Sequence, residues 1–161
     1  MIRIGKVAAL CTLAATLTAG SAQACWTNAE QDAAKVANLN MMMMVSALRC
    51  RKGPDDFLAE YNRFVVQNNP VIGAQNAAVR EHFARDTGVS NADAAMDKFI
   101  IAIANSYGGG HDRLGCSELK MIAQDLSRSG HTVGSLLAIA RENVDSAPLS
   151  GGSCQVNIAS R

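Results

Sequence analysis

The chain has 161 residues, of which 48% are apolar, 18% charged and only 4% aromatic. This apolar content excludes a disordered chain, and a net charge of +1 gives no electrostatic basis for binding nucleic acid or an anionic membrane. Abundant alanine, few β-branched runs and only three prolines favour an all-α fold over a β-sheet protein.

The first 24 residues have the pattern of a cleaved export signal. Arg3 and Lys6 form a short basic region, residues 7–17 are uncharged and apolar, and Ala22-Gln23-Ala24 supplies a small-x-small cleavage pattern. The apolar stretch is shorter than the roughly 20 residues of a membrane-spanning helix. We therefore expect removal of residues 1–24, which leaves no transmembrane anchor and places the mature protein in the periplasm or outside the cell.

The expected mature chain, residues 25–161, has the length of one helical domain. Loss of the two basic signal residues leaves 13 basic residues against 14 acidic ones, a net charge of −1. Lipidation of Cys25 is an alternative, because a cysteine directly after a cleavage point is also where lipoproteins are anchored. Ala22 and Gln23 fit the lipoprotein pattern poorly, and lipidation would leave one of the other thiols unpaired.

Four cysteines remain after cleavage, and an even number in an exported chain indicates disulfides. Of the three possible pairings we favour Cys25–Cys154, which joins the two mature ends, with Cys50–Cys116, which joins the end of the first helix to a later one. Neither a Cys-x-x-Cys pair nor a His at zinc-ligand spacing occurs. The sequence therefore predicts two disulfides, no metal and no cofactor.

Capping residues and apolar periodicity predict a compact bundle of five to six helices. Thr27 and Glu30 form a capping box for the first helix. Pro54 and the two aspartates after it suit the start of the second, which we expect to end at Pro70. The expected segments are 28–52, 54–69, 71–86, 92–107, 116–129 and 133–144, with an irregular tail from about residue 145.

The helix over 92–107 has apolar residues on both sides, with Ile101 opposite the main stripe, so we expect it to be central and covered on both faces.

Four consecutive methionines, residues 41–44, cannot share one face of the first helix at 100° per residue. Most of them suit the bundle core. Met42 instead falls on the polar side of the helix, beside Ser46, in what we consider a possible partner surface. This surface consists of Met42, Lys35, Asn38 and Arg49. Asn40 falls within the apolar stripe and, if buried, needs hydrogen-bond partners.

The loop after Gly108-Gly109-Gly110 is a second possible site, because loops on a rigid scaffold often carry function. It contains His111 and Asp112, and Ser117 follows in a Ser-x-x-Lys pattern. The further elements of enzymes that use this pattern are absent from the sequence. A flexible connector and an exposed first helical turn are the alternative interpretations.

Cys25-Trp26, Leu48-Arg49-Cys50-Arg51, Tyr61-Asn62-Arg63-Phe64 and Ala104-Asn105-Ser106-Tyr107-Gly108 resemble stretches of small exported helical proteins of alphaproteobacteria that have four mature cysteines. The resemblance covers nearly the whole mature chain and implies no catalytic motif.

The sequence as a whole favours an exported, non-catalytic helical protein that binds an envelope protein or a small ligand. One alternative is a small periplasmic hydrolase with a site in the 108–117 loop. A structural or oligomeric envelope component is the other.

Overall fold

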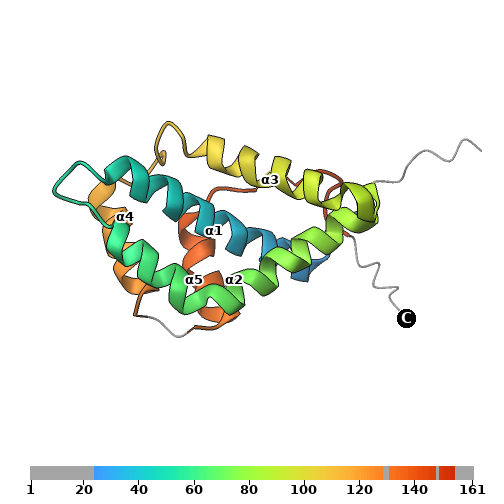
Figure 1. Cartoon of the computed structure of the whole chain (residues 1–161), viewed down its shortest axis with the longest axis horizontal. Helices are drawn as coiled ribbons and strands as arrows, with labels where there is room; N and C mark the ends of the chain where they lie inside the picture. Colours follow the sequence, from blue (N-terminus) through green and yellow to red (C-terminus); the bar gives the residue numbers. More distant parts are fainter. Residues whose placement is uncertain (1–23, 129–130, 148, 155–161) are drawn as a thin grey trace, which may run out of the picture.

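The computed structural model describes residues 24–128, 131–147 and 149–154, so the predicted export signal lies outside the described residues. Within these ranges the chain is all-helical, as predicted (Figure 1). The elements are α1 (Asn28–Cys50), α2 (Leu58–Thr87), the short 3₁₀ helix η1 (Val89–Asn91), α3 (Ala92–Ser106), α4 (Cys116–Leu126) and α5 (Val133–Asn143). In the described part, no helix combines the length and apolar character needed to cross a bilayer.

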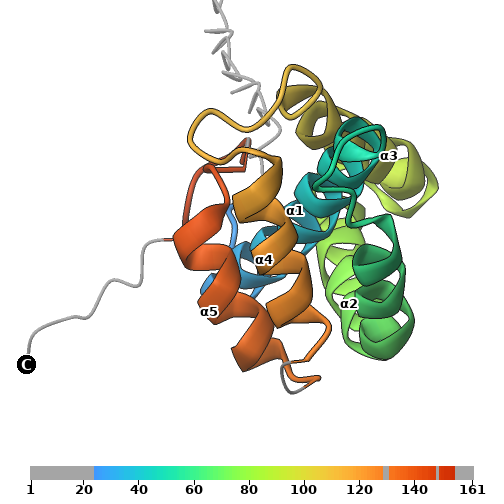
Figure 2. The same ribbon diagram turned by 90° about the vertical axis from the view of Figure 1, so that its left-hand side faces the viewer.

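The central helix of the bundle is α1, which the other helices surround (Figures 1 and 2). It begins at the predicted capping box, where the Glu30 amide donates to Thr27 Oγ1 at 3.3 Å and the Thr27 amide donates to Glu30 Oε2 at 3.0 Å. Because α2, α3, α4 and α5 all contact it, α1 buries far more than one stripe. Its buried residues are Glu30, Ala33, Ala34, Val36, Ala37, Asn38, Leu39, Met42, Met43, Ser46, Ala47 and Cys50.

The assignment of Met42 to an exposed polar side was therefore wrong. Met42 is fully buried, and its neighbours on that side, Asn38 and Ser46, are each only 2% exposed. Conversely, Leu48, an apolar residue of the same helix, is 56% exposed. Periodicity finds the face of a helix that packs on one neighbour, whereas α1 packs on several.

The helix over 92–107 is not the central one. It corresponds to α3, which lies at one side of the bundle, and Ile101 on its outer face is 57% exposed.

The two helices predicted on either side of Pro70 form one helix of 30 residues, α2. Proline at position 70 removes the hydrogen bond to the Val66 carbonyl, but both residues are exposed, so this carbonyl is accessible to water. Figure 1 shows α2 bending about midway, as expected of a helix with an internal proline. The start was also misplaced: Pro54 lies in a turn, and the Leu58 amide donates to Asp56 Oδ1 at 3.0 Å.

Both predicted disulfides are present. Cys25 pairs with Cys154 across 129 residues of sequence, and Cys50 pairs with Cys116 across 66 residues. The first joins the segment before α1 to the tail after α5. The second fixes the end of α1 to the start of α4.

The burial of Met42 predicts a core role that can be measured. Met42→Ala should lower the free energy of unfolding by about 2–5 kcal/mol, because it removes buried thioether and methylene groups and leaves a cavity. Leu48→Ala on the same helix should change it by less than about 0.5 kcal/mol, because its side chain is largely exposed. Urea denaturation measures both, and equal losses would contradict the packing of α1.

The disulfides should stabilise chiefly by restricting the unfolded chain. Replacing either pair by alanines should lower the free energy of unfolding by about 2–4 kcal/mol, with a somewhat larger loss for the longer Cys25–Cys154 loop. Denaturation of the two double variants, with a free-thiol assay on the parent, makes the comparison. Free thiols in the parent protein would contradict the pairing.

Candidate functional site

The two described ends of the chain meet beside Trp26, which is fully buried. The Trp26 amide donates to the Gly152 carbonyl at 2.8 Å, and the Cys154 amide donates to the Trp26 carbonyl at 2.9 Å. The indole N–H donates to the Ser150 carbonyl at 2.7 Å. Together with the Cys25–Cys154 disulfide, these bonds hold the tail over the ends of α2 and α3.

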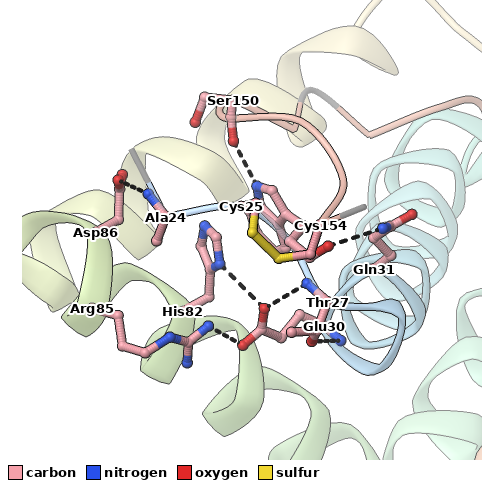
Figure 3. Close-up of a disulfide and its surroundings, with 11 residues drawn as sticks. Ala24, Cys25, Thr27, Glu30, Gln31, His82, Arg85, Asp86, Ser150 and Cys154 are labelled. Atoms are coloured by element: carbon pink, nitrogen blue, oxygen red, sulfur yellow. Dashed lines mark hydrogen bonds and ion pairs between the residues drawn. A yellow bond between two sulfur atoms is a disulfide. The ribbon is translucent and has the colours of Figure 1, made fainter. Parts of the chain in front are cut away.

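A polar cluster lies beneath this junction (Figure 3). Glu30, at the start of α1, accepts hydrogen bonds from the Thr27 amide and from the Arg85 guanidinium, and its Oε2 lies 3.4 Å from His82 Nδ1. His82 is fully buried and stacks on Trp26, with ring centroids 3.6 Å apart and 20° between the planes. Nothing in the sequence links positions 30 and 82, so the pair was not predicted.

The charge state of the cluster follows from its surroundings. Burial raises the pKa of the Glu30 carboxyl, but hydrogen bonds from Thr27 and Arg85 outweigh this effect and leave the pKa below its usual value. Burial lowers the pKa of His82, and the contact with Glu30 only partly opposes this effect. Near neutral pH the cluster therefore holds an ionised Glu30, a charged Arg85 and a neutral His82.

This cluster can orient side chains but cannot present them to a substrate. His82 is 0% exposed, and its Nε2 has no partner among the described residues. In the neutral ring the unpaired Nε2 is then an acceptor, with the proton on Nδ1 facing Glu30. We therefore assign the cluster a structural role: it fixes Trp26 against α2.

A cavity of about 490 Å³ lies between α2, α3 and the tail, close to this cluster. Its size is within the usual range for small-ligand sites. Phe83 and Phe99 form an aromatic wall, with ring centroids 5.7 Å apart. The lining residues are Phe83, Asp86, Thr87, Asn91, Ala94, Ala95, Lys98, Phe99, Ala102 and Ser150.

Two opposite charges line the cavity. Lys98 is exposed and forms no ion pair within the described part of the chain. Asp86 accepts a hydrogen bond from the Ala24 amide at 2.9 Å through Oδ1 (Figure 3). Ala24 is the last residue of the predicted export signal, so cleavage at the predicted point removes this donor and makes the nitrogen of the next residue, Cys25, the α-ammonium group of the mature chain. The cavity lining itself offers an apolar wall, the Lys98 cation and the Asp86 carboxylate.

The four residues predicted as a partner surface do not form one. Asn38 and Met42 are buried, and Lys35 is half-buried and pairs with Asp32 at 3.4 Å. The Arg49 guanidinium is exposed but donates to the Gly108 carbonyl. Gly110 lies beside this guanidinium and has a φ of +117°, a backbone conformation that favours glycine.

Asn38 is buried because it completes a hydrogen-bonded network. It accepts from the Tyr107 hydroxyl at 2.9 Å and donates to the Asp145 carbonyl at 2.8 Å, and the Asp145 amide donates to the Tyr107 hydroxyl at 3.3 Å. The network joins α1, the end of α3 and the segment after α5. Asn40, predicted to need partners, is half-buried and accepts from the Tyr61 hydroxyl at 3.4 Å.

The loop residues considered for a hydrolase have other partners. His111 donates from Nε2 to the Asn143 carbonyl at 2.8 Å, and its Nδ1 accepts from the Arg113 amide at 3.1 Å. The Ser117 hydroxyl donates to Glu118 at 2.9 Å, and Asp112 is exposed. With both ring nitrogens of His111 engaged by backbone groups, neither is available as a base for Ser117 in this arrangement.

Across the described residues, no three His, Cys, Asp or Glu side chains gather as a metal site would require. The sequence matches no protein-family model, and no curated protein and no solved structure proved similar to it. The resemblance to exported alphaproteobacterial proteins therefore stays a prediction, and function must be argued from the residues themselves.

The buried His82 predicts a loss of stability in mild acid. Its folded pKa lies below the unfolded value of about 6.5, so the native state binds fewer protons than the unfolded chain. The free energy of unfolding should be constant above about pH 6.5 and decrease as the pH falls from there toward the folded pKa. Glu30 adds a further loss below its own unfolded pKa of about 4.3.

Urea denaturation between neutral and acidic pH tests this. His82→Phe keeps a ring against Trp26 and should remove the decrease nearest pH 6.5, whereas His131→Gln, at an exposed histidine, should leave it unchanged. An unaltered pH profile in the His82→Phe protein would rule out His82 as its source.

Proposed function

We propose that this is an exported binding protein whose ligand is a small zwitterion with an apolar body, such as a free apolar amino acid. The observation that carries the proposal is the cavity between α2, α3 and the tail, where an aromatic wall lies beside Lys98 and Asp86. The two disulfides, which use all four cysteines of the expected mature chain, support an oxidising compartment.

The chemistry of the lining favours this ligand class over a purely apolar one. Three alanines, with the small exposed parts of Phe83 and Phe99 (each 6% exposed), offer apolar surface that an aliphatic or aromatic group can cover. Lys98 supplies a cation for a carboxylate, and Asp86, once the Ala24 amide is removed, supplies an acceptor for which the ammonium group of the ligand competes with the new α-ammonium group of Cys25. A ligand with only one charge would leave the opposite side chain without a partner in the cavity.

Three related compounds test the proposal on the protein purified from the periplasm. Phenylalanine has both charges, 3-phenylpropionate lacks the ammonium group and phenethylamine lacks the carboxylate. Calorimetry or NMR titration should rank phenylalanine first, by about tenfold or more, because each charge-assisted hydrogen bond contributes roughly 1.5–3 kcal/mol. Equal affinity for all three, or no binding of any, would refute the ligand class.

Variants that remove the charge of Lys98 or Asp86 test whether these two side chains cause the ranking of the three compounds. Lys98→Gln should weaken phenylalanine and 3-phenylpropionate but not phenethylamine, and Asp86→Asn should weaken phenylalanine and phenethylamine but not 3-phenylpropionate. Lys52→Gln and Asp112→Asn, exposed residues that do not line the cavity, are the matched controls. Ala102→Phe should block the cavity, while Ala59→Phe on exposed α2 surface should not. Concentration-dependent assembly without ligand binding would instead favour a structural envelope component.

A further inference from the structure

A second surface, remote from the cavity, has the character of a protein-docking groove. It lies between α4 and α5, which run side by side (Figure 2), and has a volume of about 390 Å³. None of its lining residues belongs to the cavity between α2 and α3. They are Leu114, Glu118, Met121, Ile122, Asp125, Ile139, Glu142 and Asn143.

The sequence places these residues together by helical spacing. Glu118, Ile122 and Asp125 follow one another at intervals of four and three residues, so they share a face of α4. Ile139 and Glu142 are likewise three residues apart on α5. The shared pattern is an apolar residue flanked by a carboxylate on each helix.

The apolar part of the groove is unusually open. Met121 is 58% exposed, one of the few large apolar side chains of the described chain that is mainly in contact with solvent. A methionine side chain is unbranched and polarizable, which suits a surface that adapts to a partner. Leu114, Ile122 and Ile139 are half-buried beside it and form the floor.

The charge of the groove has a single sign. Glu118, Asp125 and Glu142 line it, and no lysine or arginine does. Two nearby basic side chains have partners outside the groove: Arg141 pairs with Asp32 at 3.4 Å, and Lys120 donates to the Pro54 carbonyl at 3.1 Å. Arg128, which follows α4, pairs with Asp125 at 3.3 Å and compensates that carboxylate, so Glu118 and Glu142 carry the acidic charge of the groove.

Glu118 is fixed in its ionised form. Its own backbone amide and the Ser117 hydroxyl hold the pKa of the carboxyl below its usual value. The carboxylate also accepts from the Gly115 amide at 3.0 Å, which caps α4.

From these features we propose that the α4–α5 groove docks a cationic amphipathic helix, with the apolar face on Met121 and its neighbours and Lys or Arg side chains on Glu118 and Glu142. Each helix of the groove has 11 residues, a length of about 16 Å, which matches roughly three turns of a docked helix. An anionic membrane is excluded as the occupant because the same carboxylates repel it.

A synthetic Leu/Lys peptide of about four turns, roughly 14 residues at 3.6 residues per turn, serves as the probe. We expect it to bind the exported protein in fluorescence anisotropy, with an affinity that falls as salt is raised. Two further peptides are compared, one with the same composition scrambled to lose its apolar face and one with Glu in place of Lys. Both should bind at least tenfold more weakly.

Variants of the groove decide whether the probe binds there. Glu118→Gln with Glu142→Gln, in which glutamine keeps the α4 capping bond, should weaken the peptide at least tenfold. Met121→Ser should also weaken it, with less effect on the salt dependence. Glu81→Gln with Asp97→Asn removes two exposed carboxylates of α2 and α3 and is the matched control.

Equal peptide affinity in the groove and control variants, binding of the scrambled peptide as tightly as the amphipathic one, or no binding at all would each overturn the proposal. So would self-association of the protein that buries the groove and is abolished by Met121→Ser, because the occupant would then be a second copy. Circular dichroism and urea denaturation confirm that each variant is folded before binding is measured.

Discussion

The junction between the start of α1 and the tail positions both ends of the bundle, and the cavity depends on it. Trp26 is held from one side by backbone bonds to Gly152 and Cys154 and from the other by its stack on His82. Ser150, which accepts from the indole, is also a lining residue of the cavity. The Cys25–Cys154 disulfide adds a covalent restraint to the hydrogen bonds that hold this part of the wall in place.

The polar cluster beneath Trp26 shows how a charged helix start is accommodated in a core. Glu30 is needed as the capping residue of α1, yet the helix begins inside the bundle, where an unpaired carboxylate would be costly. Arg85 and the Thr27 amide compensate the charge, and His82 fills the remaining contact in its neutral form. Glu30 thus both caps its own helix and forms the contacts that join α1 to α2.

Sequence reasoning succeeded where the cause is local or covalent. The capping box at Thr27 is recognisable from a short pattern, the four mature cysteines indicate two disulfides, and the favoured pairing is the one present. It failed at Pro70 and Met42, because tolerance of a proline depends on which carbonyl faces water, and burial of a methionine depends on how many helices surround α1. Neither property exists until the helices are packed.

The candidate cavity and groove were not predicted, because they too exist only once the helices are packed. Their charged residues are the clearest example. Asp86 and Lys98 read in sequence as ordinary surface charges, 12 residues apart on different helices. A near-neutral total also conceals the groove, which Glu118, Asp125 and Glu142 line while Arg141 of α5 pairs with Asp32 of α1. The net charge sums over the whole surface of the protein, whereas a partner contacts only one face of it. The proposed ligand without net charge matches the balanced cavity, and the proposed cationic helix matches the acidic groove, so the two proposals depend on where the charges of a near-neutral chain lie.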